Sequence, residues 1–384
     1  MSTTGRPERT APASSDIAAS LLDSEFVRLV VAATGDGVAA GGLLTKALDA
    51  HDIAHQASVV ALPAPAQRAT DADLTIALGR PSSDADIALG VDTTPASTTA
   101  LAVATELGTV DYELALAGII AGGAYPPDDV LGAAAERGID RRPGVAVPTT
   151  ELADGLAHSS LVHAPFSGDP ETASEMVTAA GCDAATETSS EDERRRAASM
   201  VALTVCEDTQ CPPQAADAVE RFLHPLDAPG GLLATVGGYA DVLDAVAQSN
   251  PGSAIALTLG ALDTETALDT WRAHTSRAHE AVRSASTGRY DGLFVVRSDG
   301  AAPLGTVARL VAAYRSPEPL VLAIDDDDAV VMGASEIAAS EHVGSLVASA
   351  ATKVGGLGDG TALTGYATFD CEPTEFVAVL REER

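Results

Sequence analysis

The sequence predicts an α/β protein with a parallel-sheet N-terminal domain, a helical bridge and a smaller α/β C-terminal domain. The apolar run at 26–33 leads through the glycine-containing stretch TGDGVAAGGLLTK (34–46) into apolar residues at helical spacing, which is how a parallel sheet often opens. From about residue 232, strand and helix patterns alternate again. We expect a disordered tail at 1–15, the first domain at 16–165, the bridge at 166–231 and the C-terminal domain at 232–384.

In the first domain, Asp16 is placed to cap a short helix that ends near residue 22. The Gly stretch at 34–46 is read as a tight loop followed by a helix. Short apolar runs then predict three strands, at 57–62, 74–78 and 87–91. Ala-rich or apolar segments predict helices at 97–107, 112–123 and 128–137.

The bridge has a charged helical segment at 190–206 and a second helix at 213–223. In the C-terminal domain we expect strands at 254–259, 292–297, 320–324 and 329–332. The expected helices are 239–248, 262–284, 305–314, 336–352 and 374–380. The four aspartates at 325–328 join two apolar runs and favour a hairpin turn over a metal site, because Asp is a common turn residue.

The composition gives a formal net charge of -32 over 384 residues, and all but two of the 23 basic residues are Arg. The exceptions are Lys46 and Lys353. This composition resembles that of proteins from salt-in halophiles, and it disfavours nucleic-acid binding through a broad basic patch. The four scattered cysteines predict free thiols. No apolar run approaches the ~20 residues of a membrane span, and the chain starts without an apolar leader, so we expect no membrane contact and a cytoplasmic location.

Three segments carry a family resemblance: TGDGVAAGGLL (34–44), GLAHSSLVHAPFSGD (155–169) and GGLGDGTALTGYA (355–367). With the order of the elements, they make the chain similar to the DHH phosphoesterase superfamily, and within it to archaeal RecJ-like proteins. The resemblance implies a DHH-like first domain and a DHH-associated C-terminal domain. Active members hold two Mn²⁺ or Mg²⁺ ions on carboxylates and histidines from four motifs, which activate water for phosphodiester cleavage.

The resemblance also implies that these motifs are degenerate here. The first motif is represented by Ala32, Thr34, Asp36 and Gly37, the second by Ala77-Leu78-Gly79, the third by Asp92-Thr93-Thr94, the fourth by Gly122, and the histidine of the terminal glycine-rich stretch by Thr361. Asp36 and Asp92 are the ligand positions that remain. We therefore expect no catalytic residue, no metal site and no cofactor.

The predicted function is a catalytically degenerate scaffold or accessory factor in DNA replication or repair. The resemblance implies GINS and the MCM ring as partners, and single-stranded DNA as a further ligand. Backbone N–H groups in the glycine-rich stretches are expected to contact nucleic acid or phosphate, at Gly37, Gly355, Gly356, Gly358, Gly360 and Thr361. The five glycines of 354–367 are equally compatible with close approach of another backbone.

Two other functions stay open. One is a Mn- or Mg-dependent single-strand exonuclease or phosphoesterase that uses Asp36, Asp92 and further ligands. The other is a nucleotide-binding α/β protein whose first glycine stretch holds a phosphate at a helix N-terminus. Among the histidines, His51 and His55 are expected to be solvated, whereas His158 and His163 would bond to backbone or contact phosphate.

Overall fold

The computed structural model describes residues 12–384 except 64–70, 83, 183–189, 208–210 and 339. Most of the expected tail therefore lies outside the described residues, although helix α1 (Ser14–Leu22) already begins inside it. Asp16 is not the cap of this helix, as we expected, because Ala13 takes the N-cap position and Asp16 lies in the first turn.

The N-terminal unit is built on a four-stranded parallel sheet with the strand order β2-β1-β3-β4. The strands are β1 (Phe26–Ala32), β2 (Ala54–Val60), β3 (Leu74–Leu78) and β4 (Ile87–Leu89). Six of the seven β1 residues are buried, as expected for a central strand that is covered on both sides. The helices of this unit are α2 (Gly35–Ala50), α3 (Ala96–Glu106), α4 (Tyr112–Ala121) and α5 (Asp128–Ala135).

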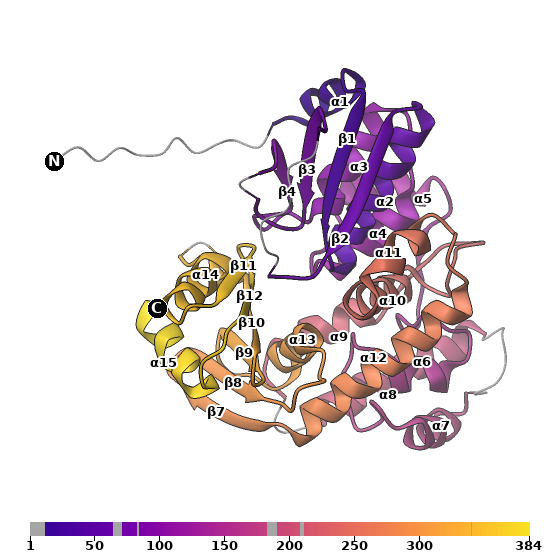
Figure 1. Cartoon of the computed structure of the whole chain (residues 1–384). Coiled ribbons are helices and arrows are strands. Elements are labelled where there is room, and N and C mark those ends of the chain that lie inside the picture. The colour runs from indigo at the N-terminus through magenta and orange to yellow at the C-terminus, as the bar shows by residue number, and fades with distance from the viewer. Residues whose placement is uncertain (1–11, 64–70, 83, 183–189, 208–210, 339) are drawn as a thin grey trace.

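The middle of the chain is mainly helical (Figure 1). A two-residue strand β5 (Asp140–Arg141) pairs with β6 (Leu226–Asp227). The helices are α6 (Leu152–His158), α7 (Pro170–Ala179), α8 (Glu191–Cys206), α9 (Ala215–Phe222), α10 (Val236–Ser249), α11 (Pro251–Thr258) and α12 (Thr264–Ser284). Helix α8 begins with a capping box between Ser190 and Glu193, which explains why its acidic residues come first.

The C-terminal unit contains a six-stranded mixed sheet with the order β11-β12-β10-β9-β8-β7. Its strands are β7 (Ser286–Tyr290), β8 (Leu293–Arg297), β9 (Leu320–Ile324), β10 (Asp328–Gly333), β11 (Leu357–Gly360) and β12 (Thr364–Thr368). Its helices are α13 (Leu304–Tyr314), the 3-10 helix η1 (Ser335–Ile337), α14 (Val343–Lys353) and α15 (Pro373–Glu383). The predicted aspartate turn is confirmed, since β9 and β10 form a hairpin in which Asp325 Oδ1 accepts from the N–H groups of Asp327 and Asp328.

Three predictions of local structure were wrong. Residues 254–259 form most of helix α11 rather than a strand, because Pro251 starts a helix that packs against the glycine face of α2, near Gly41 and Gly42. The stretch 34–46 holds no loop, since Thr34 caps α2 directly and the helix begins at Gly35. The single helix expected at 336–352 is instead η1 followed by α14.

Buried side chains form three hydrophobic clusters. The first joins the parallel sheet and its helices to α10, α11 and the first half of α12, ending at Trp271. The second joins the remaining middle helices to one face of the C-terminal sheet, and the third lies on the other face, under α14 and α15. The predicted fold class is confirmed, whereas the domain boundaries at 165 and 231 stay a prediction.

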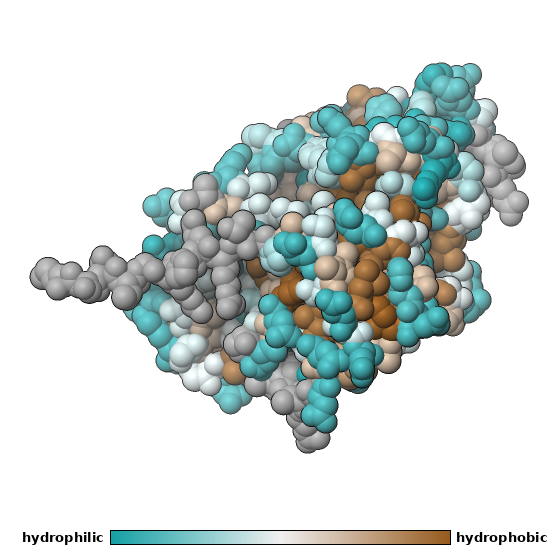
Figure 2. All heavy atoms as spheres, turned by 90° about the horizontal axis from the view of Figure 1, so that it is seen from above, coloured by the Kyte–Doolittle hydropathy of each residue, from teal (hydrophilic) through white to brown (hydrophobic). Residues whose placement is uncertain are grey.

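The surface seen from above the N-terminal unit is mostly hydrophilic, with an apolar area among the polar residues (Figure 2). Cys182, Cys206 and Cys371 are free thiols, as predicted. Within the described part of the chain, no helix is long and apolar enough to cross a membrane.

Candidate functional site

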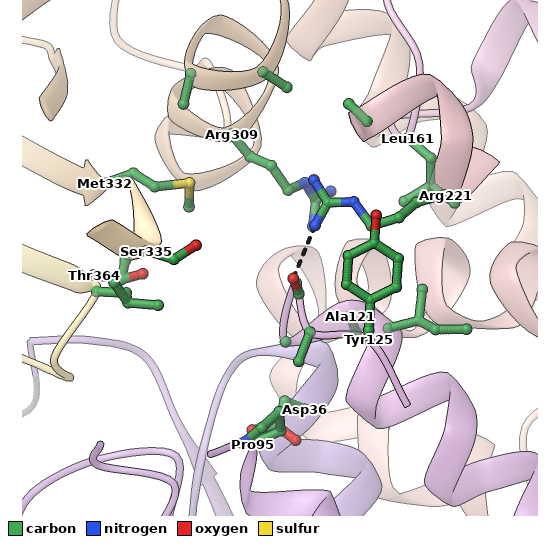
Figure 3. A pocket seen from close by; sticks show the side chains of 18 of the residues that line it. Asp36, Pro95, Ala121, Tyr125, Leu161, Arg221, Arg309, Met332, Ser335 and Thr364 are labelled. Carbon is green, nitrogen blue, oxygen red and sulfur yellow. Dashed lines mark hydrogen bonds between the residues drawn. The ribbon is translucent and has the colours of Figure 1, made fainter. Parts of the chain in front are cut away.

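A cavity of about 870 Å³ lies where the three parts of the chain meet. Figure 3 shows Asp36, Pro95, Ala121 and Tyr125 of the N-terminal unit on one side. The other sides are formed by Leu161 and Arg221 of the middle part of the chain and by Arg309 of α13. The C-terminal unit adds Met332 of β10, Ser335 of η1 and Thr364 of β12. This volume is typical of a ligand site.

The degenerate motif positions meet in this cavity. Its lining includes Thr34, Asp36, Gly79, Asp92, Thr93, Thr94, Gly122 and Thr361. The first three motifs follow β1, β3 and β4, and the carboxyl ends of parallel strands share one edge of a sheet. These positions were matched to the family's metal ligands by sequence resemblance alone, and in the structure they lie around one cavity.

At this edge, the Asp36 side chain is hydrogen-bonded to the start of helix α3. Its carboxylate is buried and accepts hydrogen bonds from the N–H groups of Ala96 (2.7 Å) and Ser97 (2.9 Å) and from the Ser97 hydroxyl. These N–H groups belong to the first turn of α3, so Asp36 caps that helix from outside. Burial raises the pKa of the Asp36 carboxyl, and the hydrogen bonds from Ser97 and Ala96 oppose that rise.

The first N–H groups of α2 are also hydrogen-bonded within the protein. The Thr34 hydroxyl accepts from the N–H of Gly37 (3.2 Å), and Asp244 of α10 accepts from the N–H of Gly35 (2.9 Å). Both are ordinary ways to satisfy the first amides of a helix. A phosphate at this helix end, as the nucleotide-binding alternative requires, would have to displace Thr34 or Asp244.

The fourth motif position is small and tightly surrounded. A Cβ at Gly122 would lie 3.3 Å from the Pro95 ring and 3.4 Å from Asp36 Cβ. An aspartate here would therefore place a second carboxylate beside Asp36. Two close carboxylates repel each other unless a proton or cation lies between them.

Asp92, the other retained position, is exposed at the cavity. Among the residues that the structure describes, no group of three or more His, Cys, Asp or Glu side chains is arranged to hold a metal ion. The expectation that Asp36 and Asp92 hold no metal stays a prediction.

A buried polar network that the sequence did not reveal joins the cavity walls. Arg309 donates to Asp244 (2.8 Å) and to the Ser160 hydroxyl (2.7 Å). Ser160 in turn donates to Asp241, which also accepts from Trp271 Nε1 (3.0 Å). Burial raises the pKa of Asp241, and Arg309 and the hydrogen bonds oppose it. The signal in the sequence was charge on mainly apolar helices: α10 is almost wholly buried but carries Asp241 and Asp244, and α13 is mostly buried but carries Arg309.

Arg221 enters the cavity from α9 (Figure 3). Its guanidinium donates to the carbonyl of Gly123 (2.9 Å) and lies 5.6 Å from the centre of the Tyr125 ring. Tyr125 itself is 55% exposed. This pair gives the cavity an aromatic and a cationic surface beside the fourth motif position.

The residues predicted to contact nucleic acid or phosphate are dispersed. Of the six, Thr361 is the one that lines the cavity. The N–H groups of Gly37, Gly355, Gly356, Gly360 and Thr361 each donate to an acceptor within the chain. At Gly356, Gly358 and Gly360 a Cβ would lie 2.1–2.5 Å from backbone atoms of Thr368, Ala348 and Thr364. Close backbone packing thus explains these glycines, and the predicted contacts stay a prediction.

The histidines mostly bond within the protein. His51 is exposed and donates to Leu107 O, and the partly buried His55 donates to Ile53 O. His158 donates to the Asp154 carbonyl. His163 does not bond to backbone as expected, because it bonds to His279 (3.1 Å) and Arg315 (3.1 Å) instead.

The chain superposes on solved structures of low sequence identity. CDC45 from Entamoeba histolytica superposes with a TM-score of 0.59 and 11% identity, covering 96% of this chain and 97% of that chain. RecJ in complex with Mg²⁺ from Thermus thermophilus gives a TM-score of 0.41 and 15% identity, covering 96% of this chain and 51% of that chain. The CDC45 superposition, the one of the two with a TM-score above 0.5, shows that this chain has a CDC45-like fold.

More specifically, the chain belongs to the family of the uncharacterized protein rrnAC1427 of Haloarcula marismortui. The two are 50% identical over 384 residues, which is the full length of both. A family model described as "Uncharacterized protein rrnAC1427, C-terminal domain" matches residues 285–382, from the start of the C-terminal sheet to α15.

Proposed function

We propose that this chain is a RecJ-like protein with degenerate metal-binding motifs that acts as a scaffold or accessory factor in DNA replication or repair. One observation supports this most. Asp36, the carboxylate that remains from the first motif, uses both oxygens to hold the first turn of α3. The framework of the site is retained, while the acid of its first motif caps a helix.

The surrounding positions support the same proposal. Thr34 is a helix cap, and Gly122 leaves no carboxylate beside Asp36. As a scaffold, the protein would act by binding other replication proteins, and the partners expected are GINS and the MCM ring. We further propose a haloarchaeal, cytoplasmic setting, in line with the net charge of -32 and the rrnAC1427 relative. Single-stranded DNA is a further ligand of this proposal.

Affinity purification of the tagged full-length chain from a native high-salt lysate tests this proposal. We expect mass spectrometry to identify GINS or MCM subunits that stay bound through molar-salt washes. The control is an equally acidic, tagged protein of unrelated fold, which should recover neither. Recovery of no replication or repair protein in repeated purifications would count against the scaffold.

The second candidate is a Mn- or Mg-dependent phosphodiesterase that degrades single-stranded DNA. It is favoured by Asp92, whose carboxylate is exposed at a cavity large enough for a nucleotide. A metal-dependent activity that needs Asp92 would decide for this candidate.

A further inference from the structure

The hairpin β11–β12 forms one rim of the cavity. Thr361, Leu363 and Thr364 of the hairpin line it, and Gly90 and Asp92 at the end of the first sheet line it from another side. In Figure 1 this hairpin lies below β4, while α13 lies further from the first sheet. The distance between hairpin and sheet therefore sets the width of the cavity at this rim.

Two polar contacts tie the hairpin to the first sheet. Arg80, which follows β3, pairs with Asp359 of β11 at 3.2 Å, and both side chains are nearly buried, with 7% and 12% exposed. Next to this pair, the N–H of Ala362 donates to the carbonyl of Val91 at 2.9 Å. A buried ion pair of this kind is screened by salt far less than an exposed one.

The closed contact is incompletely satisfied. Two nitrogens of the Arg80 guanidinium, Nε and Nη1, are buried without a hydrogen-bond partner in the described structure. A buried donor that lacks an acceptor is unfavourable, and exposure to water would relieve it. The contact thus combines an attractive ion pair with the free-energy cost of two unsatisfied Arg80 donors. That cost is removed when water reaches the guanidinium.

The hairpin is tied to the rest of its unit by backbone contacts. Gly344 of α14 packs against the backbone of Gly360, and the N–H of Gly344 donates to Thr361 O (2.8 Å). The same unit is anchored elsewhere through α13, where Arg309 bonds to Asp244 and the Tyr314 hydroxyl bonds to Leu161 O (2.8 Å). Loss of the Arg80–Asp359 contact would leave that anchor intact.

We propose that Arg80 and Asp359 form a latch that controls access to the cavity. With the latch closed, the hairpin holds the C-terminal unit against the first sheet. With it open, the unit pivots about the α13 contacts and the cavity widens at the rim formed by Asp92 and Thr361. This mechanism does not depend on what the cavity binds.

Hydrogen–deuterium exchange of the full-length protein at the Ala362 amide tests the latch. Asp359→Asn keeps the side-chain shape but removes the charge that Arg80 pairs with. We expect exchange at Ala362 to rise about tenfold or more, while the β1 amides keep their protection. The control Lys353→Gln breaks an ion pair with Glu383 inside the same unit and should leave Ala362 unchanged.

A second readout reports on the cavity itself. Met332→Cys places a thiol on the cavity wall, and its alkylation is followed peptide by peptide beside the native cysteines. We expect faster alkylation of residue 332 when Asp359→Asn is added. Unchanged Ala362 exchange and unchanged alkylation would overturn the latch. An equal rise in exchange at Ala362 and throughout β1 would overturn it too, since it would mean global unfolding.

Discussion

Arg309 and Asp244 form the ion pair that connects all three parts of the molecule. Arg309 Nη1 lies 2.8 Å from one oxygen of Asp244, and the other Asp244 oxygen accepts from the N–H of Gly35 at the start of α2. One carboxylate therefore bridges the C-terminal unit and helix α2 of the N-terminal unit, at the wall of the cavity.

Asp244→Ala should destabilise the protein by about 3 kcal/mol, because it removes the carboxylate that pairs with Arg309 Nη1 and accepts from the Gly35 amide in a largely buried place. Chemical denaturation in molar salt measures the change. Asp269→Ala, which removes an exposed partner of Arg272, is the matched control and should be close to neutral. Equal effects of the two variants would contradict the importance given to Asp244.

Asp36→Ala should lower the free energy of unfolding by about 2 kcal/mol, since it removes a cap and leaves two α3 amides unsatisfied. Asp36→Asn keeps one oxygen as an acceptor and should fall between Asp36→Ala and wild type. Thermal unfolding without added metal is the measurement. If Asp36→Ala is as stable as wild type under these conditions, Asp36 does not act as a cap.

Two glycine substitutions should change the free energy of unfolding in opposite directions. Gly118 on α4 faces Ala39 and Ser97, and an added Cβ would lie 2.4 Å from Ala39 Cβ, so Gly118→Ala should destabilise by about 1–3 kcal/mol. Gly132 on α5 has open space, so Gly132→Ala should stabilise by up to about 1 kcal/mol through helix propensity. Urea melts of both variants check this, and a stabilising Gly118→Ala would contradict the packing described.

The buried histidine His274 should make stability depend on pH. Burial lowers its pKa from 6.5 to about 4, so the unfolded chain binds a proton that the folded chain does not. The stability that folding gains from a neutral His274 is complete above pH 6.5. As the pH falls toward 4, this stability is lost at about 1.4 kcal/mol per pH unit. His274→Gln should reduce the slope of unfolding free energy against pH by that amount in this window. An unchanged slope would mean that His274 titrates alike in both states.

Much of the fold could be predicted because its signals are local. The run at 74–78 is strand β3 as predicted, and the aspartates at 325–328 form the hairpin turn. The run at 254–259 was predicted wrongly, because a short, mainly apolar segment has no period that separates a buried helix from a buried strand. Its helical state follows from Pro251 and from packing on α2.

The candidate site could be predicted only in part. The motif positions Asp36 and Asp92 share one cavity because they follow strands whose carboxyl ends lie at one edge of the first sheet. Thr361 reaches the same cavity from the β11–β12 hairpin of the other sheet. The pairing of Asp244 with Arg309, and of both with Gly35, joins residues far apart in the chain, and one sequence holds no record of such contacts. The capping role of Asp36 was hidden for the same reason: its acceptor atoms meet amides about 60 residues away.

The most direct test of the central claim is single-stranded DNA degradation by the purified protein in molar KCl with Mn²⁺, compared with Asp92→Ala. Asp92 is exposed, so its removal should leave the fold intact, which circular dichroism can verify. We predict that wild type and variant release nucleotides at the same background rate. Metal-dependent degradation that Asp92→Ala abolishes would contradict the scaffold and make the cavity the active site of a nuclease.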